Sequence, residues 1–316
     1  MTNEVEVVCT ARLHMGFLDL NGSLGRRFGS IGLALDAPRT RLSLRRSATT
    51  RVHGPEQARA AGYLGTMLER LELPGACELT IAETILAHGG LGSGTQLALA
   101  VAAAVRRLHG LALDPRADAR ALGRGGRSGI GIGLFENGGL VVDGGCGPCD
   151  APPPVLARLN MPEDWRILLV MDHTQRGLSG ARETAAFKAM PKLPEAASAR
   201  ICRLVLMQAL PAVAEADFGA FGAAITEVQA IVGDHFTPVQ GGRFGSPRVG
   251  AAMAELAALG ASGIGQSSWG PTGFAFVADE AAAQAATARL AAGEAGRGLD
   301  TRICRALNRG ATVAET

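Results

Sequence analysis

Two glycine-rich segments carry the residues of this 316-residue chain that are best suited to chemistry. The first reads Gly89-Gly-Leu-Gly-Ser-Gly-Thr95 and stands at the start of a helical pattern over 95–108. Small residues let backbone N–H groups converge at the positive end of a helix, so this segment predicts an anion site. No Lys follows it, as one would in a P-loop, and its glycine spacing differs from the dinucleotide fingerprint. Another kind of phosphate site is therefore indicated.

The second segment spans 260–273 and offers hydroxyls, an amide and many backbone donors. It predicts a second anion-contacting loop, in which Trp269 must pack against other groups because an exposed indole is costly. For both segments the structural alternative is a tight turn without a ligand. The residues expected to contact phosphate are Gly90, Gly92, Ser93, Gly94, Thr95, Gly265, Gln266, Ser267 and Ser268.

Arg12 and His14 stand two residues apart in a strand pattern, so their side chains project from the same face. Arg26 and Arg27 follow a short loop later, and together these side chains could bind a phosphate or a carboxylate. Taken singly, a strand histidine is more often structural, and arginine pairs are usually solvated.

Hydrophobic periodicity divides the chain into strand and helix segments. In the first half it predicts strands at 5–13, 39–45, 77–81 and 139–143, helices at 56–71 and 95–108, and a glycine-rich loop over 123–147 that leads into the last strand. In the second half it predicts strands at 166–171, 274–277 and 300–306, and helices within 195–232 and at 247–259 and 279–290. The proline run at 152–154 marks a boundary between domains 1–155 and 156–316.

Composition excludes several classes of function. Apolar residues make up 47% and charged residues 19%, which indicates a globular chain. With 31 basic and 29 acidic residues, the chain has no broad basic surface for nucleic acid. No signal peptide or membrane-spanning pattern is present, and the scattered cysteines fit a reducing compartment. We therefore expect a cytoplasmic protein without nucleic-acid or membrane partners.

One cysteine pair, Cys146-Gly-Pro-Cys149, has the spacing of a redox or zinc motif. Asp150 and the proline run follow it, and they cannot begin the helix that would stabilise a thiolate. A turn before a linker is the simpler interpretation.

The order of the motifs resembles the GHMP kinase superfamily, which includes galactokinase, homoserine kinase and mevalonate kinase. The matching features are the strand Ala11-Arg-Leu-His-Met-Gly16, the loop at 90–93 and the late glycine-rich loop at 263–273. The resemblance implies an α+β fold with an N-terminal α+β domain, a C-terminal ferredoxin-like domain and the ligand between them. The kinases typically continue the first loop as Gly-Leu-Gly-Ser-Ser-Ala. This chain continues it as Gly94-Thr-Gln96, which disfavours kinase activity.

Longer segments look like one family within that superfamily, the β-ribofuranosylaminobenzene 5'-phosphate synthases. The similar segments are 12–22, 27–34, 127–133, 138–145, 240–244 and 265–271. The resemblance implies an enzyme that joins phosphoribosyl pyrophosphate to 4-aminobenzoate or 4-hydroxybenzoate, with release of CO2 and pyrophosphate, in tetrahydromethanopterin biosynthesis. It also implies a homodimer, and two-fold oligomers are the commonest kind.

Such a reaction would assign roles to particular side chains. A pyrophosphate leaving group needs Mg²⁺ and several N–H or Arg donors, and the carboxylates near the motifs are candidates for the metal. An arginine would anchor the benzoate carboxylate, and a histidine would hydrogen-bond the group para to it. The expected catalytic residues are Arg12, His14, Asp172 and His173; the expected substrate-binding residues are Arg26, Arg27 and Arg176; and the expected Mg²⁺ ligands are Asp19 and Asp143, with Asp172 as a further candidate.

Two other functions stay open at this point. An ATP-dependent small-molecule kinase would hold the triphosphate at the first loop and use an Asp as base. A non-catalytic sensor of a phosphate-bearing ligand would keep the fold without the chemistry. ATP-dependent phosphorylation would establish the first function, and ligand binding without turnover would favour the second.

Overall fold

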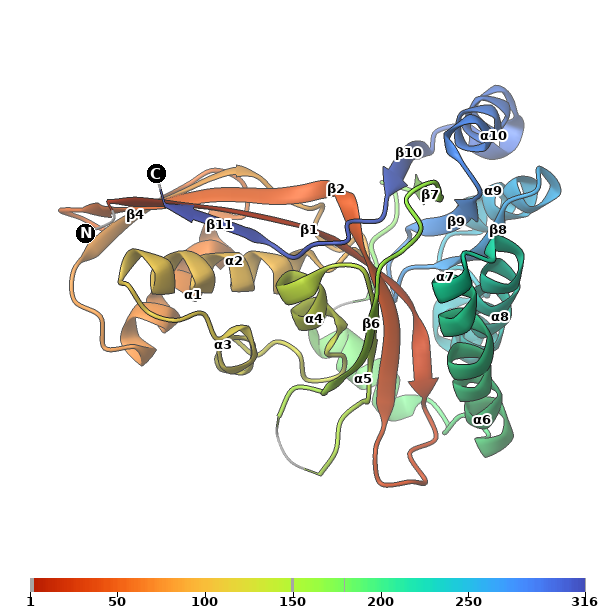
Figure 1. The fold of residues 1–316 in the computed structure, drawn as a ribbon, viewed down its shortest axis with the longest axis horizontal. Helices are drawn as coiled ribbons and strands as arrows, with labels where there is room; N and C mark the ends of the chain where they lie inside the picture. Colours follow the sequence, from red (N-terminus) through yellow and green to blue (C-terminus); the bar gives the residue numbers. More distant parts are fainter. Residues whose placement is uncertain (1–2, 149–150, 179, 316) are drawn as a thin grey trace.

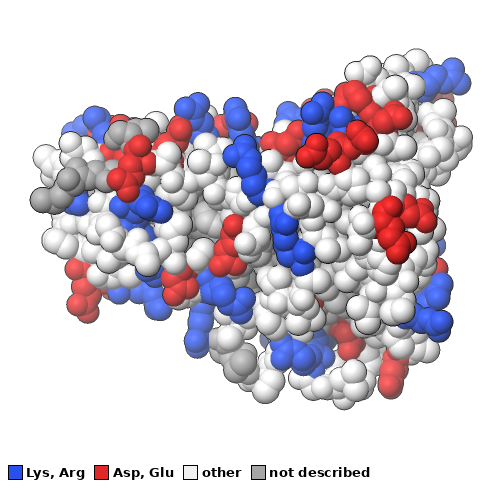
Figure 2. Space-filling view, viewed as in Figure 1, with Lys and Arg blue, Asp and Glu red and all other residues white. Residues whose placement is uncertain are grey.

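The computed structural model describes residues 3–148, 151–178 and 180–315. Its core consists of two β-sheets, one in each half of the molecule, with helices packed beneath the first sheet (Figure 1). Basic and acidic side chains are interspersed over the face shown in Figure 2, and no broad basic patch covers that face.

The first sheet is built on two long antiparallel strands, β1 (Glu4–Asp19) and β2 (Phe28–Ser47), which form a hairpin. The strand order is β11 (Thr312–Glu315), β1, β2, β4 (Ala76–Glu83) and β3 (Arg51–His53), while β5 (Leu140–Asp143) pairs with β2 and β6 (Val155–Leu159) pairs with β5. Both long strands exceed the predicted 5–13 and 39–45. In β1 the register shifts at Thr10–Arg12 and His14–Gly16 interrupt the two-residue alternation, so the pattern ends before the strand does.

Two helices, α1 (Gln57–Arg70) and α2 (Ser93–Leu108), cover one face of this sheet (Figure 1). Alternate residues of β1, including Val5 and Val7, pack with both helices in one core. Most of α2 is buried, as its apolar composition predicts. A short helix, α3 (Pro115–Ala121), follows α2.

A fourth helix, α4 (Ile130–Asn137), lies inside the segment 123–147, so the prediction of a continuous loop there is wrong. Its glycines serve close packing rather than a turn. A Cβ added at Gly131 would lie 3.0 Å from Thr95 Cγ2, and one added at Gly133 would lie 2.8 Å from Val155 Cγ2. Helix propensity alone disfavours these glycines, and the tertiary contacts override it.

The second sheet has the strand order β10 (Asp300–Arg305), β7 (Arg166–Met171), β9 (Gly273–Val277) and β8 (Ser262–Gln266), and all its pairs are antiparallel. Helices α9 (Pro247–Ala258) and α10 (Glu280–Ala292) pack on one face of it in a common core. A single 3-10 turn (Glu294–Gly296) follows α10. The order β7, α9, β8, β9, α10, β10 is a ferredoxin-like arrangement, which confirms the expected C-terminal fold.

The other face of the second sheet packs against the helices between β7 and α9. They are α5 (Gly180–Ala189), α6 (Glu195–Leu204), a π-helical turn (Val205–Ala209), α7 (Leu210–Glu215) and α8 (Phe218–Gln240). Of these, α6 and α8 also contact β1 of the first sheet. The continuous stretch Glu195–Glu215 is long and apolar enough to span a membrane by length and composition, but a core helix passes the same test, so it is weak evidence.

The sheets divide the chain differently from the proline run at 152–154. The boundary expected after 155 falls at the start of β6, and β6 still belongs to the first sheet. The chain also returns at its end, where β11 pairs with β1. Within the cysteine pair, Cys146 donates to the Gly126 carbonyl, and Cys149 lies outside the described residues.

Candidate active site

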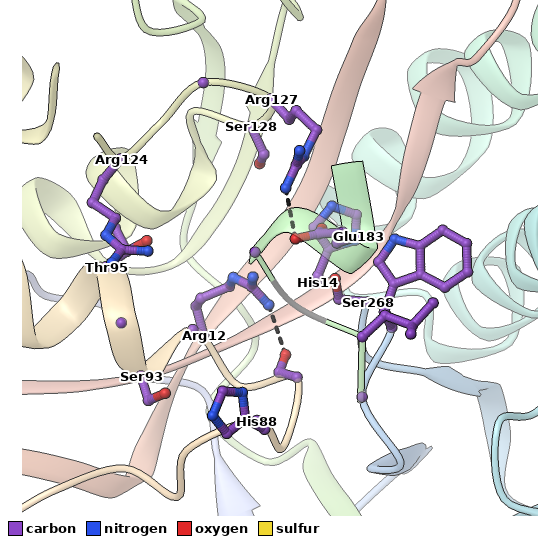
Figure 3. Close-up of a pocket in the computed structure, with 18 of the residues that line it drawn as sticks. Arg12, His14, His88, Ser93, Thr95, Arg124, Arg127, Ser128, Glu183 and Ser268 are labelled. Carbon is purple, nitrogen blue, oxygen red and sulfur yellow. Dashed lines mark hydrogen bonds and ion pairs between the residues drawn. The ribbon is translucent and has the colours of Figure 1, made fainter. Parts of the chain in front are cut away.

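A cavity of about 510 Å³ lies between the two halves of the molecule. Its walls come from β1, the first glycine-rich segment, α2, the loop before α4, α5 and the segment 268–270 (Figure 3). The charged and titratable residues that line it in the described part of the chain are Arg12, Arg59, Arg124, Arg127, His14, His88 and Glu183. The excess of positive charge favours an anionic ligand.

Arg12 holds the first glycine-rich segment against β1. Its backbone N–H donates to the Leu91 carbonyl at 3.0 Å, and Nη1 donates to the Gly90 carbonyl at 2.7 Å (Figure 3). Gly92 has a φ of 78°, and a Cβ there would lie 2.6 Å from Arg12 Cγ, so only glycine fits. Burial lowers the pKa of Arg12 to about 10, with Glu183 opposing the shift, so the guanidinium stays charged at neutral pH.

The second glycine-rich segment braces the first. Ser267 Oγ donates to the Gly90 carbonyl at 2.8 Å and accepts from the His14 backbone N–H at 3.0 Å. A Cβ added at Gly270 would lie 2.4 Å from the Gly89 carbonyl carbon, which shows how closely the segments pack. The two loops that the sequence predicts as separate anion sites therefore form one packed unit, and from the second loop Ser268 lines the cavity.

Helix α2 directs its N-terminus at the cavity. It has no side-chain cap, and Ser93, Gly94 and Thr95 of its first turn line the cavity. A Cβ added at Gly94 would lie 3.4 Å from Arg124 Nη1 and 3.8 Å from Arg59 Nη1. Uncapped N–H groups, the positive end of the helix dipole and two guanidinium groups together suit an anionic ligand group.

Helix α1 positions both of these arginines. Arg59 pairs with Glu56 at 3.3 Å. Arg124 lies 5.5 Å from the centroid of the Tyr63 ring and donates to the Tyr63 hydroxyl. The aromatic face and the hydroxyl stabilise the Arg124 guanidinium without neutralising its charge.

An aromatic wall forms another part of the cavity. Its members His14 and Phe17 have ring centroids 4.5 Å apart. Trp269 stacks on Phe236 with centroids 4.1 Å apart, which confirms that this indole packs against other groups. Burial and the neighbouring Arg12 hold the pKa of His14 well below its usual range, so its imidazole is neutral.

An ion pair between Arg127 and Glu183 crosses the cavity at 2.6 Å (Figure 3). It joins the loop before α4 to α5. Burial raises the pKa of Glu183, while Arg127 and Arg12 oppose that shift. Arg127 also lies 5.3 Å from the centroid of the Phe187 ring.

Three residues expected near the chemistry from the end of β7 lie outside the cavity lining. Asp172 is buried and accepts from the Ser246 hydroxyl at 2.7 Å and the Thr174 hydroxyl at 2.6 Å, so it organises the chain there. His173 pairs with Asp300 at 2.7 Å on the surface, and Arg176 is exposed. The strand pattern located this turn correctly but could not show which way it faces.

Arg26 and Arg27 also lie outside the cavity lining, although they are close to β1 in sequence. Arg26 donates to the carbonyls of Gly144 and Gly145, both at 2.7 Å. Arg27 lies 5.2 Å from the centroid of the Phe28 ring. The long β1–β2 hairpin carries both arginines away from His14.

The two carboxylates expected to hold a metal do not converge. Asp19 accepts from the backbone N–H groups of Asn21 and Gly22 in the turn between β1 and β2. Asp143 is fully buried and accepts from the N–H groups of Gly129 and Gly145 at 2.8 and 2.9 Å. Among the described residues, no group of three or more His, Cys, Asp or Glu side chains could hold a metal ion.

Two expected phosphate contacts serve the packing of β8 instead. The Gln266 side chain accepts from the Gly245 N–H at 2.6 Å and donates to the Ser268 carbonyl at 3.0 Å. A Cβ at Gly265 would lie 2.2 Å from Gln229 Oε1. The segment 260–273 was expected to be a loop, but it contains strand β8, and Gly265 and Gln266 belong to that strand.

Sequence reasoning missed the cavity residues that come from elements remote from the motifs. Arg59 looks like an ordinary exposed arginine on a helix, and Glu183 lies in a segment without a motif. Arg124 and Arg127 stand within the glycine tract 123–147, and two arginines among glycines were a usable signal for an anion site.

Comparison with known proteins identifies the fold. The profile of the GHMP kinase N-terminal domain matches residues 58–134, and that of the C-terminal domain matches 209–295. Homoserine kinase from Cytophaga hutchinsonii has a TM-score of 0.67 at 17% identity, covering 99% of this chain and 98% of its own. Mevalonate diphosphate decarboxylase from Staphylococcus aureus has a TM-score of 0.72 at 13% identity, covering 100% and 99%. This chain has the GHMP kinase fold, and at these identities the structural likeness shows the fold alone.

Two sequence relatives are much closer. The β-ribofuranosylphenol 5'-phosphate synthase of Methanothermobacter thermautotrophicus is 34% identical over 302 residues, covering 89% of this chain and 90% of the relative. That of Archaeoglobus fulgidus is 36% identical over 324 residues, covering 96% and 97%. This chain belongs to the β-ribofuranosylphenol 5'-phosphate synthase family and is an enzyme, a transferase.

Proposed function

We propose that the enzyme transfers the ribosyl 5-phosphate group of phosphoribosyl pyrophosphate to the ring of 4-hydroxybenzoate or 4-aminobenzoate, with loss of CO2 and pyrophosphate, in tetrahydromethanopterin biosynthesis. The observation that carries the proposal is one cavity with four arginines, a neutral histidine and an aromatic wall. Arginines suit phosphate groups and a carboxylate, and the wall suits an aromatic ring.

The cavity supports one orientation of the substrates. Phosphoribosyl pyrophosphate is an α-glycosyl donor and the relatives are named for a β-riboside, so C1 inverts and the ring must attack opposite the leaving group. We assign the pyrophosphate to the N-terminus of α2 with Arg59 and Arg124. The ring then takes the wall formed by His14, Phe17 and Trp269. Arg12 and Arg127 are left for the 5'-phosphate and the benzoate carboxylate.

The chemistry balances without a general base. The bond from C1 to the pyrophosphate oxygen breaks, and its electron pair leaves with the pyrophosphate. The ring carbon that bears the carboxylate bonds to C1, and the carbon–carbon bond to the carboxylate then breaks and returns its electrons to the ring. CO2 departs in place of a proton. This agrees with a cavity in which His14 is neutral and Glu183 is ion-paired.

Magnesium fits this site as part of the substrate rather than as a resident ion. Asp19 and Asp143 are occupied elsewhere, and Glu183 is the one carboxylate among the described lining residues. Mg²⁺ characteristically keeps several waters and binds through substrate phosphates. We therefore propose that Mg²⁺ arrives bound to the pyrophosphate and that the protein contributes the arginines.

The kinase alternative needs a base for the hydroxyl that would be phosphorylated. No aspartate lies among the described residues that line the cavity, and Glu183, the one lining carboxylate among them, is held in an ion pair with Arg127. The pKa of His14 is too low for it to take a proton at neutral pH. These features disfavour a kinase.

We also propose that the enzyme acts as a cytoplasmic homodimer. The five cysteines of the described residues are free thiols, which fits a reducing compartment. Light scattering of the purified protein would give a mass near twice 32.4 kDa if the dimer forms and near 32.4 kDa if it does not.

The direct test uses phosphoribosyl pyrophosphate, Mg²⁺ and a benzoate labelled in its carboxyl group. We expect labelled CO2 and pyrophosphate in equal amounts, and neither product when one substrate is left out. Arg124→Gln should lower kcat/KM for phosphoribosyl pyrophosphate about a hundredfold, because it loses a charge-assisted contact to the leaving group. Pyrophosphate release without CO2 would contradict the proposal.

A further inference from the structure

Glu183 is the one carboxylate among the described residues that line the cavity, and it stands among side chains that suit an anion. Its side chain is 18% exposed, and Figure 3 shows its carboxylate directed into the cavity between Arg127 and Arg12. A negative charge at this position weakens the binding of a phosphate, because like charges repel. The carboxylate therefore points to a ligand group that is neither a phosphate nor another carboxylate.

Arg127 holds this carboxylate from one side and leaves part of it open. Arg127 Nη2 lies 2.6 Å from Glu183 Oε2, and Arg127 Nη1 donates to Thr184 Oγ1 at 3.3 Å. Arg127 is the one described side chain that hydrogen-bonds Glu183, while Arg12 acts on it through its charge. An ionised carboxylate has about four acceptor positions. Glu183 can therefore accept from a ligand without giving up its ion pair.

Two kinds of ligand group would use such an acceptor: a metal ion or a pair of hydroxyl groups. A metal ion is disfavoured, because the charges of Arg12 and Arg127 act on Glu183 and no second carboxylate of the described residues lines the cavity. Adjacent hydroxyls suit the position, since each donates a hydrogen bond and a neutral diol is not repelled by the arginines. Acidic side chains bind the ribose hydroxyl of dinucleotides in the same way.

We propose that Glu183 recognises the 2- and 3-hydroxyls of the ribosyl donor and selects ribose over 2-deoxyribose at this site. This inference rests on the proposed function, which assigns the pyrophosphate to the N-terminus of α2 and leaves Arg12 and Arg127 for the 5'-phosphate and the benzoate carboxylate. The ribose joins the two phosphate-bearing ends of the donor. It therefore lies between α2 and these two arginines, where the Glu183 carboxylate projects from α5.

The same contact would assist the reaction. As the pyrophosphate departs, C1 of the ribose gains positive charge, and the neighbouring 2-hydroxyl becomes a stronger donor. Hydrogen bonds to a sugar 2-hydroxyl strengthen in this way in glycosyl transfer. The bond to Glu183 is then stronger in the transition state than in the bound substrate, while the proton stays on the hydroxyl oxygen.

The test compares ribose 5-phosphate with 2-deoxyribose 5-phosphate, two sugars that differ only in the 2-hydroxyl, by calorimetry. We expect the wild-type protein to bind ribose 5-phosphate about tenfold more tightly, the ratio that one charge-assisted hydrogen bond represents. Glu183→Ala should reduce this ratio to less than about twofold. Glu183→Gln keeps an acceptor of the same shape without the charge, so its ratio should fall between the two. Equal affinity for both sugars in the wild type would overturn the inference.

A control variant and a third ligand separate sugar recognition from a role in orienting Arg127. Thr184→Val removes the other contact of α5 with Arg127 and keeps the carboxylate, so the ratio of the two sugars should not change. Inorganic phosphate should bind Glu183→Ala at least as tightly as the wild type, because a negative charge beside Arg12 and Arg127 is gone. If Glu183→Ala weakens phosphate and both sugars by the same factor, Glu183 only orients Arg127 and the inference fails.

Turnover distinguishes this inference from the proposed function. Glu183→Gln should lower kcat at saturating phosphoribosyl pyrophosphate about tenfold, because the strengthened contact is made in the transition state. A protein whose preference for ribose depends on Glu183 but which releases no CO2 would contradict the proposed function and leave the ribose site standing. A protein that releases CO2 and pyrophosphate while binding both sugars equally would overturn this inference alone.

Discussion

His14 lacks a charge in a cavity where the four arginines are charged. It is neutral because burial and Arg12 both disfavour the imidazolium. That neutrality matters for the proposed chemistry, because a cationic ring would repel the positive charge that develops on the substrate. Sequence reasoning selected His14 from its strand position beside Arg12. It could not foresee the burial that sets the protonation state.

The protonation state of His14 predicts a pH dependence of stability. The pKa of His14 in the folded protein is below its unfolded value of about 6.5. At a pH between these two pKa values, His14 binds a proton in the unfolded chain but not in the folded protein. The free energy of unfolding is therefore highest above pH 6.5 and falls as the pH is lowered through that window, by up to about 1.4 kcal/mol per pH unit. Denaturant unfolding at pH 7.5 and 5.5 should show a larger loss for the wild type than for His14→Gln. Identical losses would mean that His14 is protonated in the folded state.

Substitution of Asp143 tests whether this carboxylate binds Mg²⁺ or only accepts hydrogen bonds within the protein. Its carboxylate accepts from the N–H groups of Gly129 and Gly145 and from the Ser128 hydroxyl at 3.1 Å. Asp143→Ala leaves those buried donors unpaired and should cost about 1–3 kcal/mol of unfolding free energy, measured by denaturant titration. Mg²⁺ alone should not change the melting temperature of the wild type. A Mg²⁺-dependent rise in the wild type that disappears in Asp143→Ala would restore Asp143 as a metal ligand.

Single elements were predictable where an uninterrupted apolar run marks a buried helix or strand. Helix α2 and strand β7 are apolar on nearly every side, and both were found close to their predicted bounds. Helix α4 was missed because its glycines disfavour a helix locally and are explained only by contacts with Thr95 and Val155. The two glycine-rich segments were found as motifs. Their packing was not, because the hydrogen bond from Ser267 to Gly90 joins residues 177 positions apart, and no local sequence pattern contains such a contact.

The packing of the two glycine segments predicts a matched pair of substitutions. Gly90 and Gly110 both adopt positive φ, 79° and 69°, so alanine strains the backbone at either position by a similar amount. A Cβ at Gly90 would lie 2.2 Å from the Ser267 carbonyl oxygen, whereas one at Gly110 meets nothing within 4 Å. Gly110→Ala should cost about 1 kcal/mol and keep activity. Gly90→Ala should cost several kcal/mol more and raise the KM for phosphoribosyl pyrophosphate at least tenfold. Similar melting temperatures and KM values for the two variants would contradict the close packing of the two glycine-rich segments.

At the scale of the whole molecule, the cavity depends on both halves of the chain. Arg12, Arg59 and Arg124 come from the first half, and Glu183 and Trp269 come from the second. Two domains and the ferredoxin-like fold of the second were foreseeable from motif order, and the expectation that the ligand lies between them stays a prediction. The precise division was not, because β6 and β11 rejoin the first sheet through pairings distant in sequence. We therefore expect the affinities for phosphoribosyl pyrophosphate and for the benzoate to depend on the same packing of the two halves against each other.

The return of β11 to the first sheet predicts an effect of the C-terminus on stability. Val313 of β11 packs against the core beneath that sheet and pairs with Val7 of β1. Replacing 312–316 by a Gly-Ser segment of equal length should lower the free energy of unfolding by about 2 kcal/mol, through lost burial and strand pairing. The KM values should change little, because β11 does not line the cavity. Unchanged stability would show that the pairing contributes nothing.

The central claim is that ribose becomes bonded to the ring carbon that carried the carboxylate. Phosphoribosyl pyrophosphate labelled with ¹³C at C1 and 4-hydroxybenzoate labelled with ¹³C at that ring carbon can be incubated with the enzyme and the product examined by NMR. A one-bond ¹³C–¹³C coupling in a β-configured riboside is the predicted result. A product without that coupling, with ribose joined through oxygen and the carboxylate retained, would contradict the account.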